Sequence, residues 1–185
     1  MKNSSSSVVK LQRMENTATP TFFNDQDILE INFSLIKKLK EAASNDISKR
    51  ARFNLHKSHQ DKVHEMIVAL HQDTYVRPHQ HSNKTESFHL IEGSLVVIFF
   101  DDDGKIINQI KMSESENKLP FIYRLSSDWW HMVIPLTEFV VFHETTNGPF
   151  IKGETKFPDW APEDKDTYEV EAFKQRIKNE VLGDN

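Results

Sequence analysis

The sequence predicts an all-β core, an antiparallel jelly-roll barrel (double-stranded β-helix) in a single domain, with N- and C-terminal helices on either side of it. Between residues 50 and 145, turn signals recur every 8–14 residues and no helical period appears, which is typical of such a barrel. Apolar residues three or four positions apart occur before and after this span. We therefore expect a flexible Ser-rich tail (1–20), an N-terminal arm and helix (21–50), the barrel (51–147), and a C-terminal arm and helix (148–185).

Composition narrows the class of protein. A chain of 185 residues is long enough for one domain with a substantial core. The formal net charge of −5 argues against nucleic acid as a partner. The absence of cysteine excludes disulfides and thiolate metal ligands, so any metal must be held by histidine and carboxylate. No apolar run has the length of a membrane span, and no apolar segment follows Lys2 as in a signal peptide, so a cytoplasmic location is expected.

Two segments have helical periodicity. The first is expected to form a helix at about 31–44 on the outside of the main fold, because its apolar residues recur at helical spacing: Ile28, Ile31, Leu35, Leu39 and Ala42. The second is expected over Asp164–Leu182, where the apolar positions are Tyr168, Phe173, Ile177 and Val181.

The strands of the barrel are expected where β-forming residues alternate or run together between turns. They are Arg52–His56, Lys62–Leu70, Tyr75–His81, Phe88–Phe100, Lys105–Met112, Pro120–Leu125, Trp129–Ile134 and Glu138–Glu144. Gly93 marks a turn inside the long segment, and Asp101–Gly104 is typical of a hairpin turn.

The stretch Tyr75–Gly93 contains the candidate site. His79 and His81 are separated by one residue, so on a strand their side chains share a face. The polar turn at 82–85 would return Glu86 beside them. Two imidazoles and a carboxylate form a recurring site for one divalent metal ion, Zn, Fe, Mn or Ni. A fourth ligand should come from a later strand, and His131 and His143 are the two histidines downstream of Gly93.

Other residues lie an even number of positions from these ligands on the same expected strand, so their side chains share a face with them. They are candidates for lining the interior. Tyr75 and Arg77 match His79 and His81, and Trp129 matches His131. An unpaired interior guanidinium would carry a heavy desolvation penalty, so Arg77 should either meet a carboxylate or an anionic substrate there, or lie at the barrel mouth beside an acidic neighbour.

A polar strand face provides a second set of candidates. Arg52, Asn54 and His56 alternate with Phe53 and Leu55, so the three polar side chains share one face. This face could hydrogen-bond a sugar or phosphate, or it could be an edge strand that faces solvent.

The spacing of His79, His81, Glu86 and Gly93, H-x-H-x4-E-x6-G, resembles the first signature motif of the cupin superfamily, although Asp73 replaces the leading Gly of that motif. The stretch corresponding to the second motif, residues 126–135, contains His131 and departs from the usual Pro, Gly and Asn at Ser126, Asp128 and Pro135. The resemblance favours His131 over His143 as the fourth ligand.

The sequence also resembles the WbuC family of cupin-fold metalloproteins, over residues 51–70, 73–104, 148–150 and 157–164. The resemblance implies a single-domain jelly-roll cupin that binds a divalent metal through His79, His81, Glu86 and His131. It also implies a link to O-antigen, that is surface-polysaccharide, biosynthesis in bacteria.

Together these observations favour a metal-dependent enzyme of the isomerase or epimerase type that acts on a sugar or nucleotide-sugar. In that role His56, Tyr75 or His143 would move the proton, and Arg52, Asn54, Arg77 and Trp129 would bind the substrate. The alternatives are an Fe(II)-dependent cupin dioxygenase and a non-catalytic cupin that binds a small ligand. The expected partners are a sugar-like small molecule, either neutral or anionic, and a second copy of the chain in a homodimer.

Overall fold

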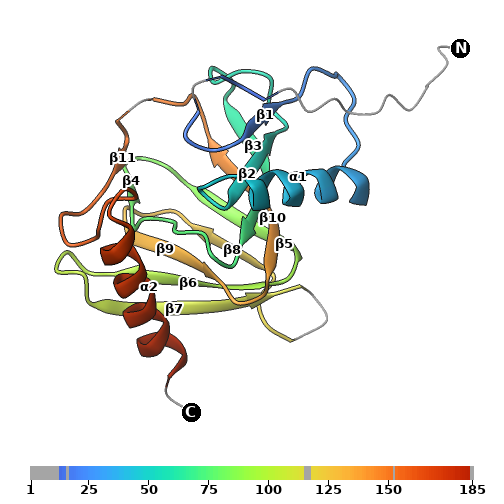
Figure 1. Cartoon of the computed structure of the whole chain (residues 1–185). Helices are drawn as coiled ribbons and strands as arrows, with labels where there is room; N and C mark the ends of the chain where they lie inside the picture. The colour runs from blue at the N-terminus through green and yellow to red at the C-terminus, as the bar shows by residue number, and fades with distance from the viewer. Residues whose placement is uncertain (1–12, 16, 115–117, 152, 184–185) are drawn as a thin grey trace, which may run out of the picture.

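The computed structural model of the chain describes residues 13–15, 17–114, 118–151 and 153–183. Its elements in chain order are β1 (Thr21–Phe23), α1 (Phe33–Asn45), β2 (Arg50–Asn54), β3 (Val63–His71), β4 (Gln80–His81), β5 (Glu86–Glu92), β6 (Ser94–Phe100), β7 (Ile106–Ser113), β8 (Ile122–Leu125), β9 (Trp130–Pro135), β10 (Phe139–Asn147), β11 (Thr155–Lys156) and α2 (Thr167–Leu182). The predicted all-β core between two terminal helices is confirmed (Figure 1).

The strands form two main sheets and a short ribbon. The larger sheet has the order β1-β2-β3-β10-β5-β8, the smaller one β7-β6-β9, and β4 pairs with β11. The strand pairs are antiparallel except for β1 and β2, which run parallel. Alternate residues point to opposite faces of a sheet, so each main sheet has one face toward the other sheet and one face toward a helix.

The main core lies between the inner faces of the two sheets. It contains Met66 and Val68 of β3, Phe142 of β10, and Val97 and Phe99 of β6, together with further apolar residues of both sheets. Directly paired residues of neighbouring strands point to the same face. A residue that is paired with one of these core residues in the strand register therefore also points inward.

Helix α1 covers the outer face of the larger sheet (Figure 1). Asn32 caps its N-terminus, because the Asn32 side chain accepts a hydrogen bond from the backbone N–H of Leu35. Leu35, Ile36, Leu39 and Ala43 then pack against residues of β2, β3 and β10. The expected helix at 31–44 is confirmed with a shift of one or two residues.

Helix α2 covers the outer face of the smaller sheet. Phe173, Ile177 and Val181 pack on Val96, Ile98 and other residues of β6 and β9. The expected helix is confirmed, but it begins at Thr167, and Tyr168 is 86% exposed rather than part of the apolar stripe.

Gly93 is the point at which the chain passes from the larger to the smaller sheet. The single long strand expected over Phe88–Phe100 is divided there into β5 and β6, which belong to different sheets. Gly93 has φ +82°, and a Cβ at this position would lie 2.3 Å from the carbonyl oxygen of Phe139. Glycine is therefore required by both backbone conformation and space.

Two other expectations need correction. The strand expected over Tyr75–His81 is reduced to β4, because Pro78 has no N–H to donate and His79 pairs with a different strand through an isolated bridge to His131. Residues 1–12 of the expected tail lie outside the described residues. Thr19 and Pro20 at its end are buried, and the N–H of Met14 donates to Thr21, so the packed part of the chain starts earlier than expected.

Within the described part of the chain, no helix combines the length and the apolar character needed to cross a membrane.

Candidate metal centre

The backbone brings two distant histidines into direct register. The N–H of His79 donates to the carbonyl of His131, and the N–H of His131 donates to the carbonyl of His79, both at 2.9 Å. This closed pair places the two side chains on one face of the local ladder. His131 is opposite Phe99 of the main core, so this face is the inner face of the smaller sheet.

Three imidazoles converge at this point. His79, His81 and His131 each offer a ring nitrogen, and these atoms lie within 4.8 Å of one another. The ring centroids are 4.8 Å apart for His79 and His81, 4.4 Å for His79 and His131, and 5.6 Å for His81 and His131. We call these residues the histidine trio. The trio could hold a metal ion.

Each imidazole of the trio has its Nδ1 atom occupied by a hydrogen-bond partner. Nδ1 of His79 donates to the carbonyl of Arg77 at 2.9 Å, and Nδ1 of His131 donates to the carbonyl of Trp129 at 2.9 Å. Nδ1 of His81 lies 3.1 Å from the hydroxyl of Thr155. With the proton on Nδ1, the lone pair of Nε2 is available to a metal ion. This is the arrangement found around histidine metal ligands.

Glu86 of β5 approaches the trio from the larger sheet. Its side chain is buried, with Oε1 3.2 Å from Nε2 of His131 and Oε2 3.7 Å from Nε2 of His81. The hydroxyl of Tyr123 on β8 also donates to Oε1. The candidate centre therefore lies between the two sheets, with imidazoles on one side and a carboxylate on the other.

The four groups differ in their preferred charge. Burial, and next the neighbouring His131, lower the pKa of His79 to about 3, and burial lowers the pKa of His81. Burial also acts on Glu86, where it would raise the pKa, but His131 and Tyr123 outweigh it and lower the pKa to about 2. For His131 the carboxylate of Glu86 outweighs burial and raises the pKa. Without a metal, this favours a Glu86–His131 ion pair beside two neutral imidazoles.

The residues fit a divalent metal ion. Nε2 of His131 is buried and forms no hydrogen bond within the described residues, although it lies close to Glu86. Imidazole nitrogen and carboxylate oxygen are the ligands that Zn, Fe, Mn and Ni accept in proteins. Buried polar atoms normally have a partner, and a metal ion would supply one here.

Tyr75 and Arg77 contact the C-terminal segment. The Tyr75 hydroxyl donates to the carbonyl of Pro162 at 3.0 Å. The Arg77 guanidinium donates to the carbonyls of Pro158 and Ala161, at 3.2 and 3.1 Å. Within the described residues, Arg77 hydrogen-bonds these backbone carbonyls and forms no ion pair with a carboxylate within 4.0 Å.

His143 and His56 lie away from the trio. His143 pairs with Ile67, which belongs to the outer core under α1, so its side chain is on the opposite face of the sheet from Glu86. Its Nε2 atom is 3.4 Å from Glu65. The catalytic role expected for His143 needs correction, because a sheet separates it from the centre.

His56 belongs to a separate cluster of rings. It stacks on His64 with ring centroids 4.1 Å apart and an interplanar angle of 5°, and it contacts the edge of Phe23. Its Nδ1 atom lies 3.0 Å from the carbonyl of Glu65. These contacts occupy the His56 ring without involving the trio.

The polar face expected on the first barrel strand points inward. Arg52 pairs with Val68 and Asn54 pairs with Met66, both residues of the main core. Oδ1 of Asn54 is buried and has no hydrogen-bond partner within the described residues. Trp129, in contrast, is 46% exposed, and its described polar contribution to the centre is the carbonyl that accepts from His131.

Besides Thr155, two residues near the centre were not predicted from the sequence. Tyr123 hydrogen-bonds Glu86, as described above. Glu144 pairs with Met66 on one side and Phe88 on the other, so it is on the inner face of β10, two positions from the partner of Glu86. An acidic residue at the end of an apolar strand is the signal that could have identified it.

Glu144 has no hydrogen-bond or ion-pair partner among the described residues. Its side chain forms no hydrogen bond, and no ion pair within 4.0 Å, with any residue that the structure describes. Burial is the largest influence on it, followed by the charge of Glu86, and together they raise the pKa of Glu144 to about 7 against the opposing effect of Arg52. A carboxylic acid in this range can both take up and release a proton near neutral pH.

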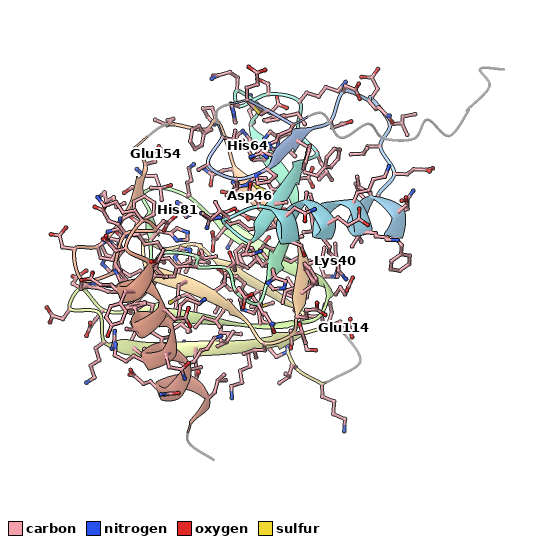
Figure 2. The ribbon with its side chains drawn as sticks, viewed as in Figure 1. Lys40, Asp46, His64, His81, Glu114 and Glu154 are labelled. Carbon is pink, nitrogen blue, oxygen red and sulfur yellow. The ribbon has the colours of Figure 1, made fainter. Side chains whose placement is uncertain are left out.

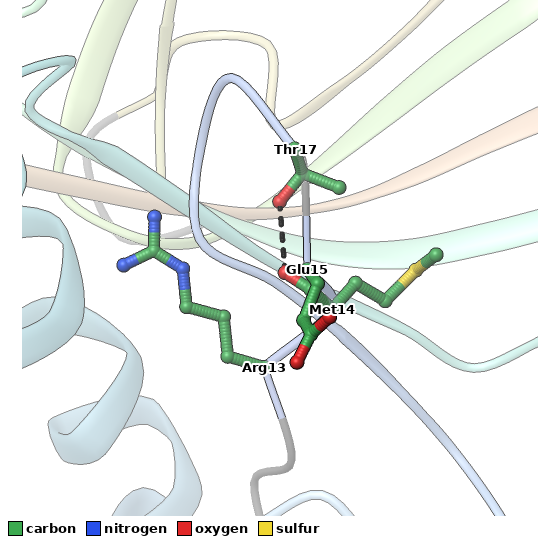
Figure 3. Close-up of a pocket in the computed structure, with 4 residues that line it drawn as sticks. All are labelled: Arg13, Met14, Glu15 and Thr17. Atoms are coloured by element: carbon green, nitrogen blue, oxygen red, sulfur yellow. Dashed lines mark hydrogen bonds between the residues drawn. The ribbon is translucent and has the colours of Figure 1, made fainter.

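An open hollow of about 450 Å³ lies elsewhere, along the N-terminal segment (Figure 3). It is lined by Arg13, Met14, Glu15 and Thr17, and the Thr17 hydroxyl donates to the carbonyl of Met14 at 3.4 Å. None of the site residues expected from the sequence lines this hollow.

One family model matches part of the chain. The model of DUF6016, a domain of unknown function, matches residues 31–112, which is less than half of the chain. The matched segment includes His79, His81 and Glu86 and ends before His131. None of the curated proteins compared with the sequence matches it.

Solved structures show what the fold resembles. Protein SO0799 from Shewanella oneidensis is 7% identical with a TM-score of 0.50, over 60% of this chain and 75% of that one. CapF with the inhibitor 3-isopropenyl-tropolone is 19% identical with a TM-score of 0.50, over 62% of this chain and 33% of CapF. A cupin superfamily protein from Desulfitobacterium hafniense is 13% identical with a TM-score of 0.41, over 53% and 76%. At these identities the likeness is one of fold, and the matched part of this chain spans about a third of the length of CapF.

Proposed function

We propose that the chain is a cupin metalloprotein that binds one divalent metal ion through His79, His81, His131 and Glu86. We further propose that it is an enzyme of the isomerase or epimerase type acting on a sugar or nucleotide-sugar. The observation that carries the proposal is the convergence of three imidazoles, each with Nδ1 occupied by a hydrogen-bond partner. They lie beside the buried carboxylate of Glu86, which is 3.2 Å from Nε2 of His131 and 3.7 Å from Nε2 of His81.

The bound metal would act as a Lewis acid that polarises a carbonyl or hydroxyl of the substrate. The residues of the chain supply the remaining functions. The carbonyls of Arg77 and Trp129 and the hydroxyl of Thr155 orient the three rings. Glu144 is the group that we assign to proton transfer, because its carboxylate faces the same interior and has no other partner among the described residues. Its pKa near neutrality agrees with this role.

The substrate class is inferred from the inner face of β2 and β10. Arg52, Asn54 and Glu144 all point inward, and they combine a guanidinium, an unpartnered amide oxygen and a carboxylate. Such groups hydrogen-bond hydroxyls, and the guanidinium can additionally bind an anionic substituent. A sugar or nucleotide-sugar carries both kinds of group, and CapF, whose fold is similar, has been described as a capsular polysaccharide assembling protein.

The metal site is tested by elemental analysis of protein purified without a metal-affinity tag. We expect nearly one equivalent of metal in the wild type and in His143→Ala, and its loss in the His79→Ala/His81→Ala double variant. His143→Ala is the matched control because it removes an imidazole on the opposite face of the sheet. Absence of metal from the wild type even after reconstitution, or equal loss in His143→Ala, would contradict the proposal.

The reaction class is tested with free hexoses and nucleoside-diphosphate hexoses in D2O. Isomerisation or epimerisation through proton transfer exchanges a carbon-bound hydrogen for deuterium, which NMR detects. We expect exchange with the metal-loaded wild type and its loss in Glu144→Gln, with metal content unchanged. If no sugar exchanges while metal is bound, the enzymatic part of the proposal is wrong. Bound iron with substrate-dependent oxygen consumption would instead support a dioxygenase.

The homodimer expected from the sequence stays a prediction. Size-exclusion chromatography with light scattering measures it, and a mass close to twice that of the 21.6 kDa chain is the expected result.

A further inference from the structure

A strap from the C-terminal arm crosses the metal centre. We define the strap as residues 153–162. Its strand β11 pairs with β4 so that Thr155 is opposite His81 and Lys156 is opposite Gln80. The N–H of Ser82 also donates to the carbonyl of Glu154 at 3.3 Å, and Figure 2 labels Glu154 and His81 in the same part of the molecule. The strap therefore lies directly against one member of the trio.

His81 differs from the other two imidazoles in the source of its Nδ1 partner. His79 and His131 bond to carbonyls two residues earlier in their own segments, so local backbone conformation orients them. The partner of His81 is the side chain of Thr155, 74 residues later in the chain. For Nε2 of His81 to serve as a ligand, Nδ1 must carry the proton and the Thr155 hydroxyl must accept it. The orientation of His81 consequently depends on the strap.

The strap is held by the segment that carries two of the ligands. Arg77 donates to the carbonyls of Pro158 and Ala161, and its guanidinium lies over the ring of Phe157, 5.1 Å from the centroid. The same residue accepts the Nδ1 proton of His79 with its own carbonyl. The ring of Phe157 is 6.4 Å from that of His79. Movement of the strap would thus disturb the surroundings of both His79 and His81.

Polar contacts hold the first half of the strap, residues 153–157, whereas Pro158 and Ala161 in the second half are buried. Lys156 is exposed and Phe157 is 51% exposed, so local opening of residues 153–157 sacrifices little buried apolar surface. Segments of this kind open with a smaller free energy than the whole domain requires. If a metal ion binds more tightly when His81 is correctly oriented, its binding shifts the strap toward the docked conformation. By linkage, docking of the strap raises the affinity for the metal by the same factor.

From this geometry we propose that Thr155 is a positioning residue for the metal centre and that docking of the strap and binding of the metal are thermodynamically coupled. The inference rests on the proposed metal site. It adds a residue and a segment that neither the sequence motif nor the ligand set includes.

The first test measures Co²⁺ and Zn²⁺ affinity by titration of metal-free protein. Thr155→Val keeps the shape of the side chain and removes the hydroxyl, and we expect the metal Kd to rise by about 10–100-fold, the usual effect of losing such a partner. Thr155→Ser restores a hydroxyl and should recover most of the affinity. Thr145→Val makes the same change on the outer face of β10 and should leave the Kd unchanged.

Thermal unfolding of the metal-free variants separates positioning from folding. We expect Thr155→Val to unfold at nearly the same temperature as Thr145→Val. If Thr155→Val binds metal as tightly as the wild type, the positioning role is wrong while the metal site stands. If the wild type itself binds neither metal, the proposed function fails first, so the two failures are distinguishable.

The second test measures amide hydrogen exchange in the strap of the wild-type chain. With Zn²⁺ bound, the amides of Glu154–Phe157 should exchange more slowly than in the metal-free protein, and this difference should be much smaller in Thr155→Val. Exchange that is equally fast with and without metal, in protein shown to bind Zn²⁺, would overturn the coupling.

Discussion

The phenolic hydroxyl of Tyr123 on β8 donates a hydrogen bond to Oε1 of Glu86 on the neighbouring strand β5, and both side chains are buried. The two residues come from one sheet, whereas the imidazoles beside Glu86 come from the opposite side of the interior. Tyr123 therefore fixes the Glu86 carboxylate from the side of the larger sheet, opposite the imidazoles. Burial and the adjacent carboxylate raise the pKa of Tyr123, so its hydroxyl stays protonated and remains a donor.

Replacing Tyr123 with Phe should weaken both the fold and the metal site. The change removes a hydrogen bond to a buried charged group, which is worth about 1.5–3 kcal/mol of unfolding free energy. We expect a loss of this size in chemical denaturation and a rise of about tenfold or more in the metal Kd. Tyr168→Phe is the matched control, because its side chain is 86% exposed and should show neither effect. Equal behaviour of the two variants would contradict the role of Tyr123.

Replacing Glu144 with Gln should change how the stability of the metal-free protein depends on pH. The pKa of Glu144 is raised from an ordinary 4.5 to about 7 in the fold. The folded protein therefore retains a proton that the unfolded chain has lost. The stability from this group is present below pH 4.5 and is lost as the pH rises through about 7.

At pH 8 the Glu144→Gln variant should consequently be more stable than the wild type, by about 1–3 kcal/mol, because each unit of pKa shift corresponds to about 1.4 kcal/mol. At pH 4.5 the difference should largely disappear. Urea unfolding at both pH values measures it. Glu138→Gln changes an exposed carboxylate just before the same strand and serves as the control. No gain at pH 8 would mean that Glu144 is not held in the protonated form.

The stacked pair His56 and His64 should make the protein sensitive to mild acid. Burial is the main cause that lowers the pKa of each imidazole from the ordinary 6.5. The unfolded chain then binds protons that the folded protein does not, so stability is present above pH 6.5 and is lost as the pH falls below it. For His64, the charges of Lys84 and His59 add to this lowering, and Asp61 opposes it.

The variant His64→Phe should lose measurably less stability between pH 7.5 and 5.5 than the wild type. The phenyl ring preserves an aromatic contact with His56 and cannot be protonated. His89→Phe, on an exposed part of β5, should follow the wild-type pH dependence and is the control. If the unfolding free energies of all three proteins change with pH in the same way, the folded protein does not resist protonation of this pair and the prediction is wrong.

Gly93 should tolerate a methyl group less well than Gly153. Both residues have positive φ, +82° and +97°, so alanine is strained at either position. At Gly93 the added Cβ would also meet the Phe139 carbonyl at 2.3 Å, whereas nothing lies within 4 Å at Gly153. We expect Gly93→Ala to lower the free energy of unfolding by at least about 2 kcal/mol more than Gly153→Ala. Equal losses would assign the whole effect to backbone strain.

Local patterns in the sequence determined both helices, most of the strands and the first half of the site. Helical spacing located α1 and α2, and the turn residues located the hairpin at Asp101–Gly104, where the N–H of Gly104 donates to Asp101. The spacing of His79 and His81 predicted a common face, because strand parity depends only on neighbouring residues. These features need no knowledge of which strands pair.

Tertiary structure decided everything that depends on pairing between distant strands. His131 and His143 both follow Gly93 in the sequence, but register places the first opposite Phe99 in the interior and the second opposite Ile67 under α1. Tyr75 and Arg77 lie an even number of positions before His79, as ligands on the same strand face would. In the structure, however, their polar groups hydrogen-bond the C-terminal strap. Tyr123 and Thr155 carry no local signal that distinguishes them from other polar strand residues. Glu144 is recognisable as an acidic residue at the end of an apolar strand, but that pattern does not say which groups it faces. The position of all three beside the centre is set by side-by-side packing of segments far apart in the chain, and a sequence pattern does not contain that register.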